Sequence, residues 1–386
     1  MRILLDCRFQ KGAGPNVATR YLLDELIKLN NEHELIILQH KGQPLPEYPN
    51  VKKMFVPFRN PLLELFWIQF WLPLLIKLNS IDICHSLKHI GPLFTNVPTI
   101  LHVHEVGHFF PEGQEGFQLS LANKIYWTQI LVWAMKQATH IIGTSQQCKT
   151  VISQKIGIPE DKVSIVPYGV SHKFRPIQDL EVILDCKHRY NLPEQYILCV
   201  GNICPQENYD TVVKMLAKLR ENCQEFPKLV LVGDTSDAGS EFFELIKQLE
   251  LSSEIIFTGF VHHNDLVYIY NGATLLLFPP TVAAFGIPPI EAMACGTPVV
   301  ASNVDAIPEV TAGAALLFNN PRNVDEMLEA ISQVIDNHKI REYLKQKGFD
   351  RAKNFSWKAS ALKVLELYKK TGIGDYIRDD NKSRYA

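Results

Sequence analysis

The segment with the clearest chemical signature runs from residue 278 to residue 300 and reads FPPTVAAFGIPPIEAMACGTPVV. An apolar strand, Thr274 to Phe278, enters a loop of proline, alanine and glycine. A helix of small residues follows around Glu291, and Gly296 ends it. A strand, a tight loop and a helix N-terminus together present backbone N–H groups and the positive end of a helix dipole. This arrangement favours the binding of an anionic group such as a phosphate.

Motifs along most of the chain resemble successive parts of glycosyltransferase family 4. The donor-sugar segment of that family is similar to FGIPPIEAMACGTPVVAS around Glu291. Other parts of the family, from its first strand to its last helix, resemble LLDCRF, YLLDELIKL, DICHSLKHIGPLFTNVPTILHVHEV, ATHIIGTSQQCKTVI, KVSIVPYGVSHKFRP, YILCVGNICPQENYDTVVKMLAKL, IIFTGFVHHNDLVYIYNGATLLLFPP and FSWKASALKVLELYKK. The combination implies the GT-B fold, in which two Rossmann-like domains face one another across a cleft.

The resemblance implies a retaining glycosyltransferase of the hexosyltransferase type. Such an enzyme moves a sugar from a nucleotide-sugar donor to an acceptor, here expected to be a glycan or a lipid-linked glycan. It needs no metal and no cofactor besides the donor, and whether the donor is UDP- or GDP-linked stays open. Because the leaving group carries phosphate charge, electrostatic stabilisation is expected to supply most of the catalysis.

Glu291 matches the glutamate that, in this family, accepts hydrogen bonds from the ribose hydroxyls of the donor. A carboxylate near a helix start is also favoured by the helix dipole, so an ordinary structural role stays open. The amides of Phe285, Gly286 and Ile287 match the loop that faces the sugar and the phosphates. Gly286 could equally serve a turn that requires positive φ.

His104 matches a histidine near the donor sugar, and the resemblance makes it the catalytic candidate. It ends a predicted strand, and ligands gather at the carboxyl ends of strands in open α/β sheets. A buried histidine of the core is nearly as compatible. Phe260 and Val261 match the loop whose backbone contacts the base, or they are plain core residues. The glycines expected near the donor phosphates are Gly201 and, if the N-terminal loop shifts its register, Gly14.

Five positions depart from the family's pattern on the surface expected to hold the donor. Gln206 and Glu207 stand where an arginine and a lysine usually neutralise the donor phosphates. Near 4 Å, the repulsion between Glu207 and a phosphate is on the order of 4 kcal/mol at a near-surface dielectric. Ala283 replaces a carboxylate expected on the donor sugar, and Val17 and Thr19 replace glycines of the N-terminal loop. Because the scaffold motifs are intact, these departures indicate a lost or altered donor.

Two functions from different classes stay open. The first is a working glycosyltransferase with an altered donor or with supplementary cations, for which Lys11, Arg20, Lys88 and Lys149 are available. The second is a catalytically inactive protein that acts as the partner or scaffold of an active glycosyltransferase. An epimerase or a phosphorylase of the same fold is less favoured. The sequence also shows no Asp-x-Asp pair or histidine spacing typical of a metal site.

Apolar strands alternate with helical patterns along the whole chain, which favours α/β architecture with two doubly wound parallel sheets. We expect an N-terminal Rossmann-like domain at 1–172 on the acceptor side, completed by a C-terminal helix at about 356–371. A second Rossmann-like domain is expected at 173–355 on the donor side, and a flexible polar tail at 372–386. The predicted strands are Arg2–Asp6, Leu35–Gln39, Ile83–Ser86, Thr99–His104, His140–Thr144, Ser164–Pro167, Ile197–Gly201, Lys228–Gly233, Ile255–Gly259, Leu275–Phe278, Pro298–Ala301 and Ala315–Phe318.

Composition excludes some classes of protein. The 39 basic and 41 acidic side chains leave a net charge of −2, so the chain carries no electrostatic footprint for nucleic acid. Its eight cysteines lack metal-ligand spacing and indicate a reducing compartment. No secretory leader is recognisable in the first residues, MRILLDCRF, so we expect a cytoplasmic location.

Residues 61–78 form the most apolar stretch and read PLLELFWIQFWLPLLIKL. Glu64, Pro73 and Lys77 interrupt it, so it falls short of a clean membrane-spanning helix. The favoured interpretation is an amphipathic helix that faces the core. The alternative is a surface helix, peripheral at the inner face of the membrane, whose aromatic side chains touch lipid or a lipid-linked acceptor.

Overall fold

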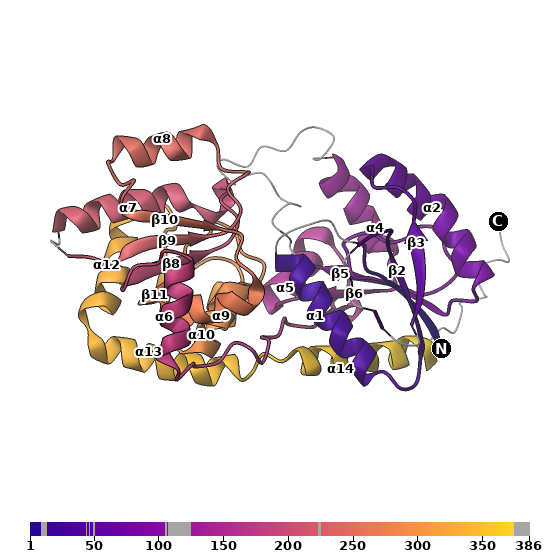
Figure 1. Ribbon diagram of the computed structural model, residues 1–386. Coiled ribbons are helices and arrows are strands. Elements are labelled where there is room, and N and C mark those ends of the chain that lie inside the picture. Colours follow the sequence, from indigo (N-terminus) through magenta and orange to yellow (C-terminus); the bar gives the residue numbers. More distant parts are fainter. Residues whose placement is uncertain are drawn as a thin grey trace.

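The computed structural model has two lobes, each built on a parallel β-sheet with helices on both faces (Figure 1). The lobe on the right of the view holds the N-terminal part of the chain, and the lobe on the left holds the strands and helices that follow. The structure describes residues 1–8, 14–43, 45, 47, 48, 51–104, 106, 125–222 and 225–373.

Both sheets have the strand order of a doubly wound fold. The first sheet runs β3 (Lys52–Val56), β2 (Glu34–His40), β1 (Arg2–Asp6), β4 (Ile83–Ser86), β5 (Thr99–Val103), β6 (His140–Gly143) and β7 (Val163–Ile165). The second runs β10 (Ile255–Gly259), β9 (Lys228–Val232), β8 (Tyr196–Val200), β11 (Leu275–Phe278), β12 (Val299–Ser302) and β13 (Leu316–Phe318). All strands within each sheet are parallel. The strand order reverses between β1 and β4 and between β8 and β11, where the chain returns to add strands on the other side of the first strand. The expected fold class is confirmed.

Helices connect the parallel strands and cover both faces of each sheet. In the first lobe they are α1 (Gly14–Leu29), α2 (Pro61–Leu78), α4 (Leu131–Gln137) and α5 (Gln146–Ile156). In the second lobe they are α6 (Leu180–Arg189), α7 (Tyr209–Asn222), α8 (Ser240–Gln248), α9 (His263–Gly272), α10 (Ile287–Cys295), α11 (Ile307–Thr311), α12 (Val324–Asp336) and α13 (His338–Ala352). α14 (Trp357–Ile373) follows them.

One strand of the first sheet was not among the predicted ones. β3 lies at the edge of the sheet, and its residues are mostly exposed or half-buried. An edge strand needs only partial burial, so Lys52 and Lys53 are tolerated there. They interrupt the apolar run by which the other strands were predicted. The other strands match the predicted ones, with differences of one or two residues at most ends.

α14 leaves the second lobe and packs along α1 of the first (Figure 1). The two helices share one buried apolar cluster with β1, and the Tyr368 hydroxyl is hydrogen-bonded to Nδ1 of His85 on β4 at 2.5 Å. The chain therefore crosses between the lobes twice. The part of the expected tail at 374–386 lies outside the described residues.

α2 has two different apolar faces. Its inner side, formed by Trp67, Ile68, Leu72 and Ile76, is buried against β1 and β2, as the core-facing interpretation requires. Its outer side is also apolar but lies open to solvent, so the helix is not amphipathic in the ordinary sense. Within the described residues, no helix has both the length and the apolar character needed to traverse a bilayer.

Candidate functional site

Two loops at the carboxyl edge of the second sheet are fixed to one another. They follow β8 and β11, the neighbouring strands at which the strand order reverses. Ligands of doubly wound folds bind at such a switch point. Thr281 donates its backbone N–H to the carbonyl of Gln206 at 2.9 Å. Asn208, held at a positive φ of 60°, donates from its amide to the carbonyl of Pro279 at 3.1 Å. The two loops therefore form one surface.

Gly286 shapes the start of α10. Its φ is 94°, and a Cβ placed there would lie 2.7 Å from Cδ1 of Ile307, so a side chain at this turn would be strained. Pro288 and Pro289 occupy the first turn of the helix and carry no N–H. The N–H groups of Phe285 and Gly286 have no hydrogen-bond acceptor among the residues that the structure describes. These two amides are therefore available to a ligand at the positive end of the helix.

Glu291 is buried on α10 and accepts a hydrogen bond from the Tyr270 hydroxyl at 3.0 Å. Burial raises the pKa of its carboxyl to about 8, and the bond from Tyr270 only partly opposes that rise. Glu291 does not lie in the first turn of α10, which holds no acidic residue. The alternative that it is an ordinary first-turn carboxylate is therefore wrong.

Glu207 lies in a short 3₁₀ turn, Pro205–Glu207, after β8. Its carboxyl carbon would lie 3.2 Å from a Cβ at Gly201, so the side chain folds back against the end of the strand. Its Oε2 is inaccessible to solvent and has no hydrogen-bond partner among the described residues. Burial raises the pKa of this carboxyl to about 7. The loop residues 201–208 and 279–286 contain no lysine or arginine, and Glu207 is their one acidic residue, so no cation in these loops can balance its charge.

Ala283 is buried, and the carboxylate of Asp305 lies close to it. Asp305 is an exposed residue that accepts the backbone N–H of Ala283 through Oδ2 at 3.0 Å, and partial desolvation of its carboxyl raises the pKa of this aspartate. Asp305 adopts a positive φ of 43°, which is uncommon for a residue other than glycine. No sequence pattern points to Asp305, because the contact joins two loops that are 22 residues apart.

His104 follows β5 at the carboxyl edge of the first sheet. Its Nε2 is 2.8 Å from the carbonyl of Leu87, and its Nδ1 is 2.6 Å from the Tyr168 hydroxyl. A carbonyl can only accept, so in the neutral ring Nε2 carries the proton and Nδ1 accepts from Tyr168. Any proton transfer by His104 would require one of these bonds to break.

The two carboxyl edges meet at the candidate site. Thr144 and Ser145, which follow β6, lie 3.4 Å from the carbonyl of Ala284 through their hydroxyls. The carboxylate of Glu309 on α11 accepts the backbone N–H groups of the first two residues of α5, at 2.8 and 3.1 Å. The Tyr168 and Phe285 rings also touch, with their centroids 5.0 Å apart. The structure thus brings the Phe285 turn to the same edge as Tyr168, the partner of His104.

The remaining sequence candidates are spread around this edge. Phe260 is 82% exposed after β10, whereas Val261 is buried beside it. Val17 and Thr19 lie within α1, which begins at Gly14, so they belong to a helix and not to a loop. The sequence missed Tyr270, Asp305 and Glu309, whose roles depend on contacts across loops and lobes. Among the described residues, no cluster of histidine, cysteine, aspartate and glutamate could hold a metal ion.

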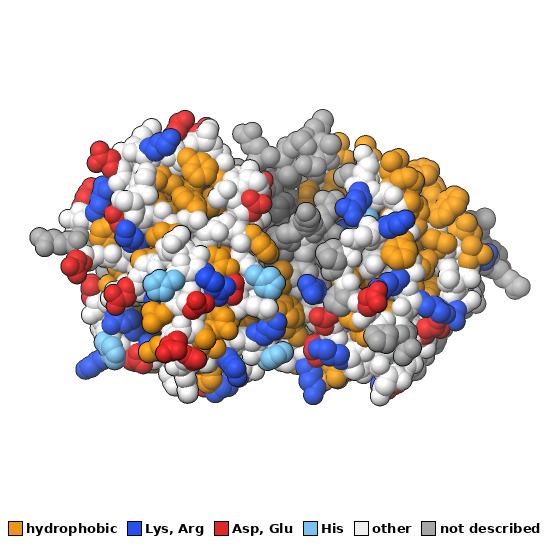
Figure 2. All heavy atoms as spheres, in the orientation of Figure 1, with side chains coloured by type: hydrophobic (Ala, Val, Ile, Leu, Met, Phe, Trp, Pro, Cys, Tyr) orange, Lys and Arg blue, Asp and Glu red, His pale blue; other side chains and the backbone are white. Residues whose placement is uncertain are grey.

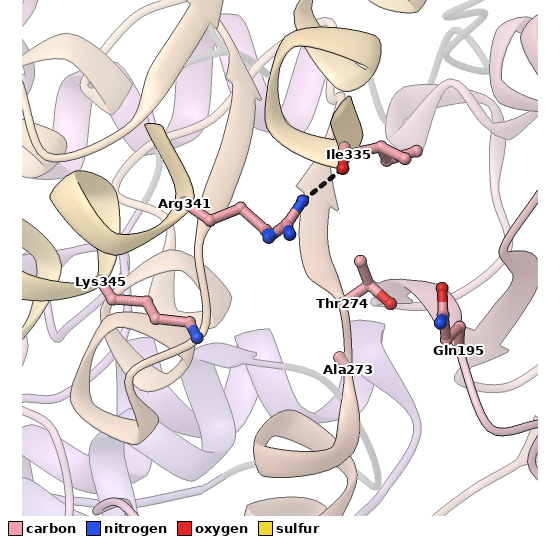
Figure 3. A pocket seen from close by; sticks show the side chains of 6 residues that line it. All are labelled: Gln195, Ala273, Thr274, Ile335, Arg341 and Lys345. Atoms are coloured by element: carbon pink, nitrogen blue, oxygen red, sulfur yellow. Dashed lines mark hydrogen bonds between the residues drawn. The ribbon is translucent and has the colours of Figure 1, made fainter. Parts of the chain in front are cut away.

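A separate cavity lies at the opposite edge of the second sheet (Figure 3). It has a volume of about 260 Å³, and Gln195 and Thr274 line it at the amino ends of β8 and β11. The Arg341 guanidinium there is hydrogen-bonded to carbonyls at the end of α12, including that of Val334 at 2.9 Å. This cavity is therefore remote from the loops of the candidate site.

Two family models match the chain and together cover most of it. The model of glycosyltransferase family 4 matches residues 12–174, and the model of glycosyl transferases group 1 matches residues 185–351. The chain is 30% identical over 229 residues to the serotype-specific mannosyltransferase WbdA of Escherichia coli. This match covers 58% of the chain but only 28% of the length of WbdA.

Other relatives match over more of their own length. The O-antigen chain mannosyltransferase RfbU of Salmonella typhimurium is 26% identical over 305 residues, which are 76% of this chain and 78% of RfbU. The structure of HepE from Anabaena in complex with UDP-glucose has a TM-score of 0.76 at 17% identity, over 96% of this chain and all of HepE. Sucrose-phosphate synthase from Thermosynechococcus elongatus has a TM-score of 0.76 at 20% identity, over 96% of this chain and 98% of the enzyme. These likenesses agree in fold.

Proposed function

Because the chain belongs to glycosyltransferase family 4, we propose that it transfers a sugar from a nucleotide-sugar donor to a glycan or lipid-linked glycan, with retention at the anomeric carbon. The observation that carries the proposal is the buried Glu291 carboxyl, positioned by Tyr270, on the helix that follows Phe285 and Gly286, whose amides have no acceptor among the described residues. RfbU and WbdA are named as mannosyltransferases, so a mannosyl group is the first donor sugar to test.

Each group of this surface has a defined task in the proposed reaction. The Glu291 carboxyl group would accept hydrogen bonds from the ribose hydroxyls of the donor. The amides of Phe285 and Gly286 would donate to the diphosphate as the bond between the anomeric carbon and the phosphate oxygen breaks. An ionised Glu207 would repel the negative charge of the diphosphate, whereas a protonated Glu207 would not. Gln206 and Glu207 stand where the family usually has an arginine and a lysine, so we expect weak donor binding. Alternatively, a cation from the carboxyl edge of the first sheet, such as Lys88, would neutralise the donor phosphates.

Nucleotide binding is the test of this function. GDP-mannose and UDP-glucose are titrated separately while thermal unfolding is followed, and a donor present at about 100 times its dissociation constant adds about 2.7 kcal/mol to stability. For a lobe of roughly 150 to 250 residues, this gain in stability corresponds to a rise of roughly 5 to 10 °C in Tm. Glu291→Gln should reduce the rise for the active donor, whereas Glu329→Gln, at an exposed position on α12, should not. A rise that is equal in both variants would contradict the role of Glu291.

The second candidate is a catalytically inactive partner of an active glycosyltransferase. Glu207 and Ala283 favour it, because they remove a cation and a carboxylate from the surface expected to bind the donor. No change in Tm with either nucleotide sugar would support this candidate over the transferase. The triple variant Gln206→Arg, Glu207→Lys, Ala283→Glu should then gain nucleotide binding. Failure to gain it would count against the idea that a donor site has decayed.

A further inference from the structure

The outer side of α2 carries an unusual set of exposed apolar side chains. Leu62 is 78% exposed, and Leu78 at the other end of the helix is 70% exposed. The set, named here the α2 patch, consists of Leu62, Leu63, Phe66, Phe70, Trp71, Leu74 and Leu78. These side chains follow helical spacing, so they share one side of a helix that is roughly 27 Å long. Figure 2 shows apolar side chains gathered over α2 at the upper right of the molecule.

The α2 patch is not what remains of an incompletely covered core. The inner side of α2 already fills the space against β1 and β2, and Trp67 and Leu72 are buried there. Single exposed apolar residues are normal on a protein surface, but a contiguous apolar set on one helix indicates an interaction surface. The patch has a neighbour as well. Gln69 is hydrogen-bonded to the segment before Phe94, whose exposed ring touches that of Trp133 with centroids 5.7 Å apart.

Cations flank the α2 patch, and no exposed acid interrupts it. Arg59 precedes the helix and Lys77 lies in its last turn, and both are exposed. The one acidic residue in Pro61–Leu78 is Glu64, which is buried and bonded to the Arg8 guanidinium. A surface of exposed aromatic and aliphatic side chains with a cationic rim matches the headgroup region of an anionic bilayer.

The beginning of α2 lies at the carboxyl edge of the first sheet. The side chain of Asn60 caps the helix by accepting the N–H of Leu62 at 3.0 Å. One turn later, Glu64 reaches Arg8, which follows β1 and also binds Asp6. The end of the patch that carries Leu62 is therefore the end nearest the candidate site.

We propose that the α2 patch lies on the surface of an anionic lipid bilayer, with the axis of α2 parallel to the membrane plane. Phe66, Phe70 and Trp71 enter the boundary between headgroups and acyl chains, and Arg59 and Lys77 contact anionic headgroups. The carboxyl edge of the first sheet then stands beside the bilayer. The proposal does not depend on donor binding, so its failure is distinguishable from failure of the proposed transferase.

Vesicle co-sedimentation of the full chain tests the α2 patch. The vesicles contain phosphatidylcholine with about one-third phosphatidylglycerol, or phosphatidylcholine alone. Phe66→Ser, Phe70→Ser and Trp71→Ser together should reduce partition into the anionic vesicles by on the order of a hundredfold or more. The matched control is Leu180→Ser with Leu184→Ser, which removes exposed apolar side chains from α6 in the other lobe and should leave partition unchanged. Equal loss in both variants, or no binding by the unaltered chain, overturns the proposal.

A second variant tests the charges without touching apolar residues. Arg59→Gln with Lys77→Gln should weaken partition about fivefold for each cation removed, and Lys214→Gln on α7 should not weaken it. Equal partition of the unaltered chain into neutral and anionic vesicles contradicts the role of the cations. Sedimentation velocity without vesicles provides the other decisive outcome. If the chain dimerises and the serine variant is a monomer, while neither binds vesicles, the α2 patch is an interface between two copies and the membrane proposal is wrong.

Discussion

Replacing Glu207 by glutamine should stabilise the protein in a manner that depends on pH. Glu207 is half-buried, its Oε2 is inaccessible to solvent, and the pKa of its carboxyl is about 7, compared with an ordinary value of 4.5, so ionising it in the folded state costs about 3 kcal/mol. The cause is burial, because Oε2 has no hydrogen-bond partner among the described residues that could stabilise the anion. Glutamine has nearly the same shape but cannot ionise.

The sign of the effect follows from proton uptake. Between pH 4.5 and about 7 the folded state keeps the proton on Glu207, whereas the unfolded chain has lost it. The folded state therefore binds more protons, and the free energy of unfolding falls as the pH rises through this window. Near pH 4.5 the variant and the unaltered chain should be equally stable. Above pH 7 the variant should be more stable by about 3 kcal/mol, or roughly 6 to 12 °C in the Tm of the second lobe.

Denaturant unfolding between pH 4.5 and pH 8 measures this difference. Glu291 also titrates with a raised pKa, but it contributes equally to both proteins and cancels in the difference between them. Glu329→Gln, at an exposed position on α12, is the control and should show no pH-dependent gain. A gain for Glu207→Gln that is the same at every pH, or that is absent at pH 8, would refute burial of an unpaired carboxyl.

The same carboxyl should also control nucleotide affinity. A diphosphate beside Glu207 favours the protonated form, so donor binding by the unaltered chain should weaken as the pH rises through 7. In calorimetric titrations, Glu207→Gln should remove most of that pH dependence. If both proteins show the same dependence, the diphosphate does not lie near Glu207.

Three further changes have expected outcomes. Gly286→Ala places a side chain on a backbone with a φ of 94° and should lower the free energy of unfolding by about 1 to 3 kcal/mol, whereas Gly239→Ala, with open space around it, should have little effect in the same thermal melts. Glu309→Ala removes the carboxylate that caps α5 across the lobes, so hydrogen exchange of the first α5 amides should accelerate about fivefold if the contact forms in solution. Tyr270→Phe leaves the Glu291 carboxyl without its donor and should destabilise the protein by about 1 to 3 kcal/mol at pH 9, where that carboxyl is ionised. The loss should be smaller at pH 6, and an equal loss at both values would show that packing, not charge, dominates.

Much of the fold could be predicted from the sequence because its strands are continuous apolar runs. A strand buried on both faces needs such a run, and β8 and β11 are of this kind. The edge strand β3 lacked the signal because partial burial tolerates Lys52 and Lys53. Gly286 was predicted as a possible positive-φ residue, and the structure confirms it.

The predicted location of the donor site stays a prediction, and the electrostatics of its residues could not be read from the sequence. The sequence predicts Glu207, Glu291 and the turn between them as parts of a site. It cannot show that Glu291 is buried, that Oε2 of the half-buried Glu207 is inaccessible, or that both carboxyls have raised pKa values. Burial depends on neighbours such as Tyr270, which come from other elements. Asp305 illustrates the same limit, because only the folded loops bring its carboxylate to the backbone of Ala283.

Backbone contacts in the second lobe hold the loops of the candidate site independently of the charges on its surface. The backbone of Gln206 still holds Thr281, and Asn208 still joins the same two loops, so these contacts do not depend on which side chains face a donor. Substitution at Glu207 or Ala283 therefore changes the charge of the surface without loosening its shape. The α2 patch lies in the other lobe and shares none of these contacts. Membrane contact through α2 is consequently compatible with either an active transferase or an inactive partner. Vesicle co-sedimentation tests where the chain binds, and nucleotide titration tests whether it binds a donor, so each proposal can fail without the other.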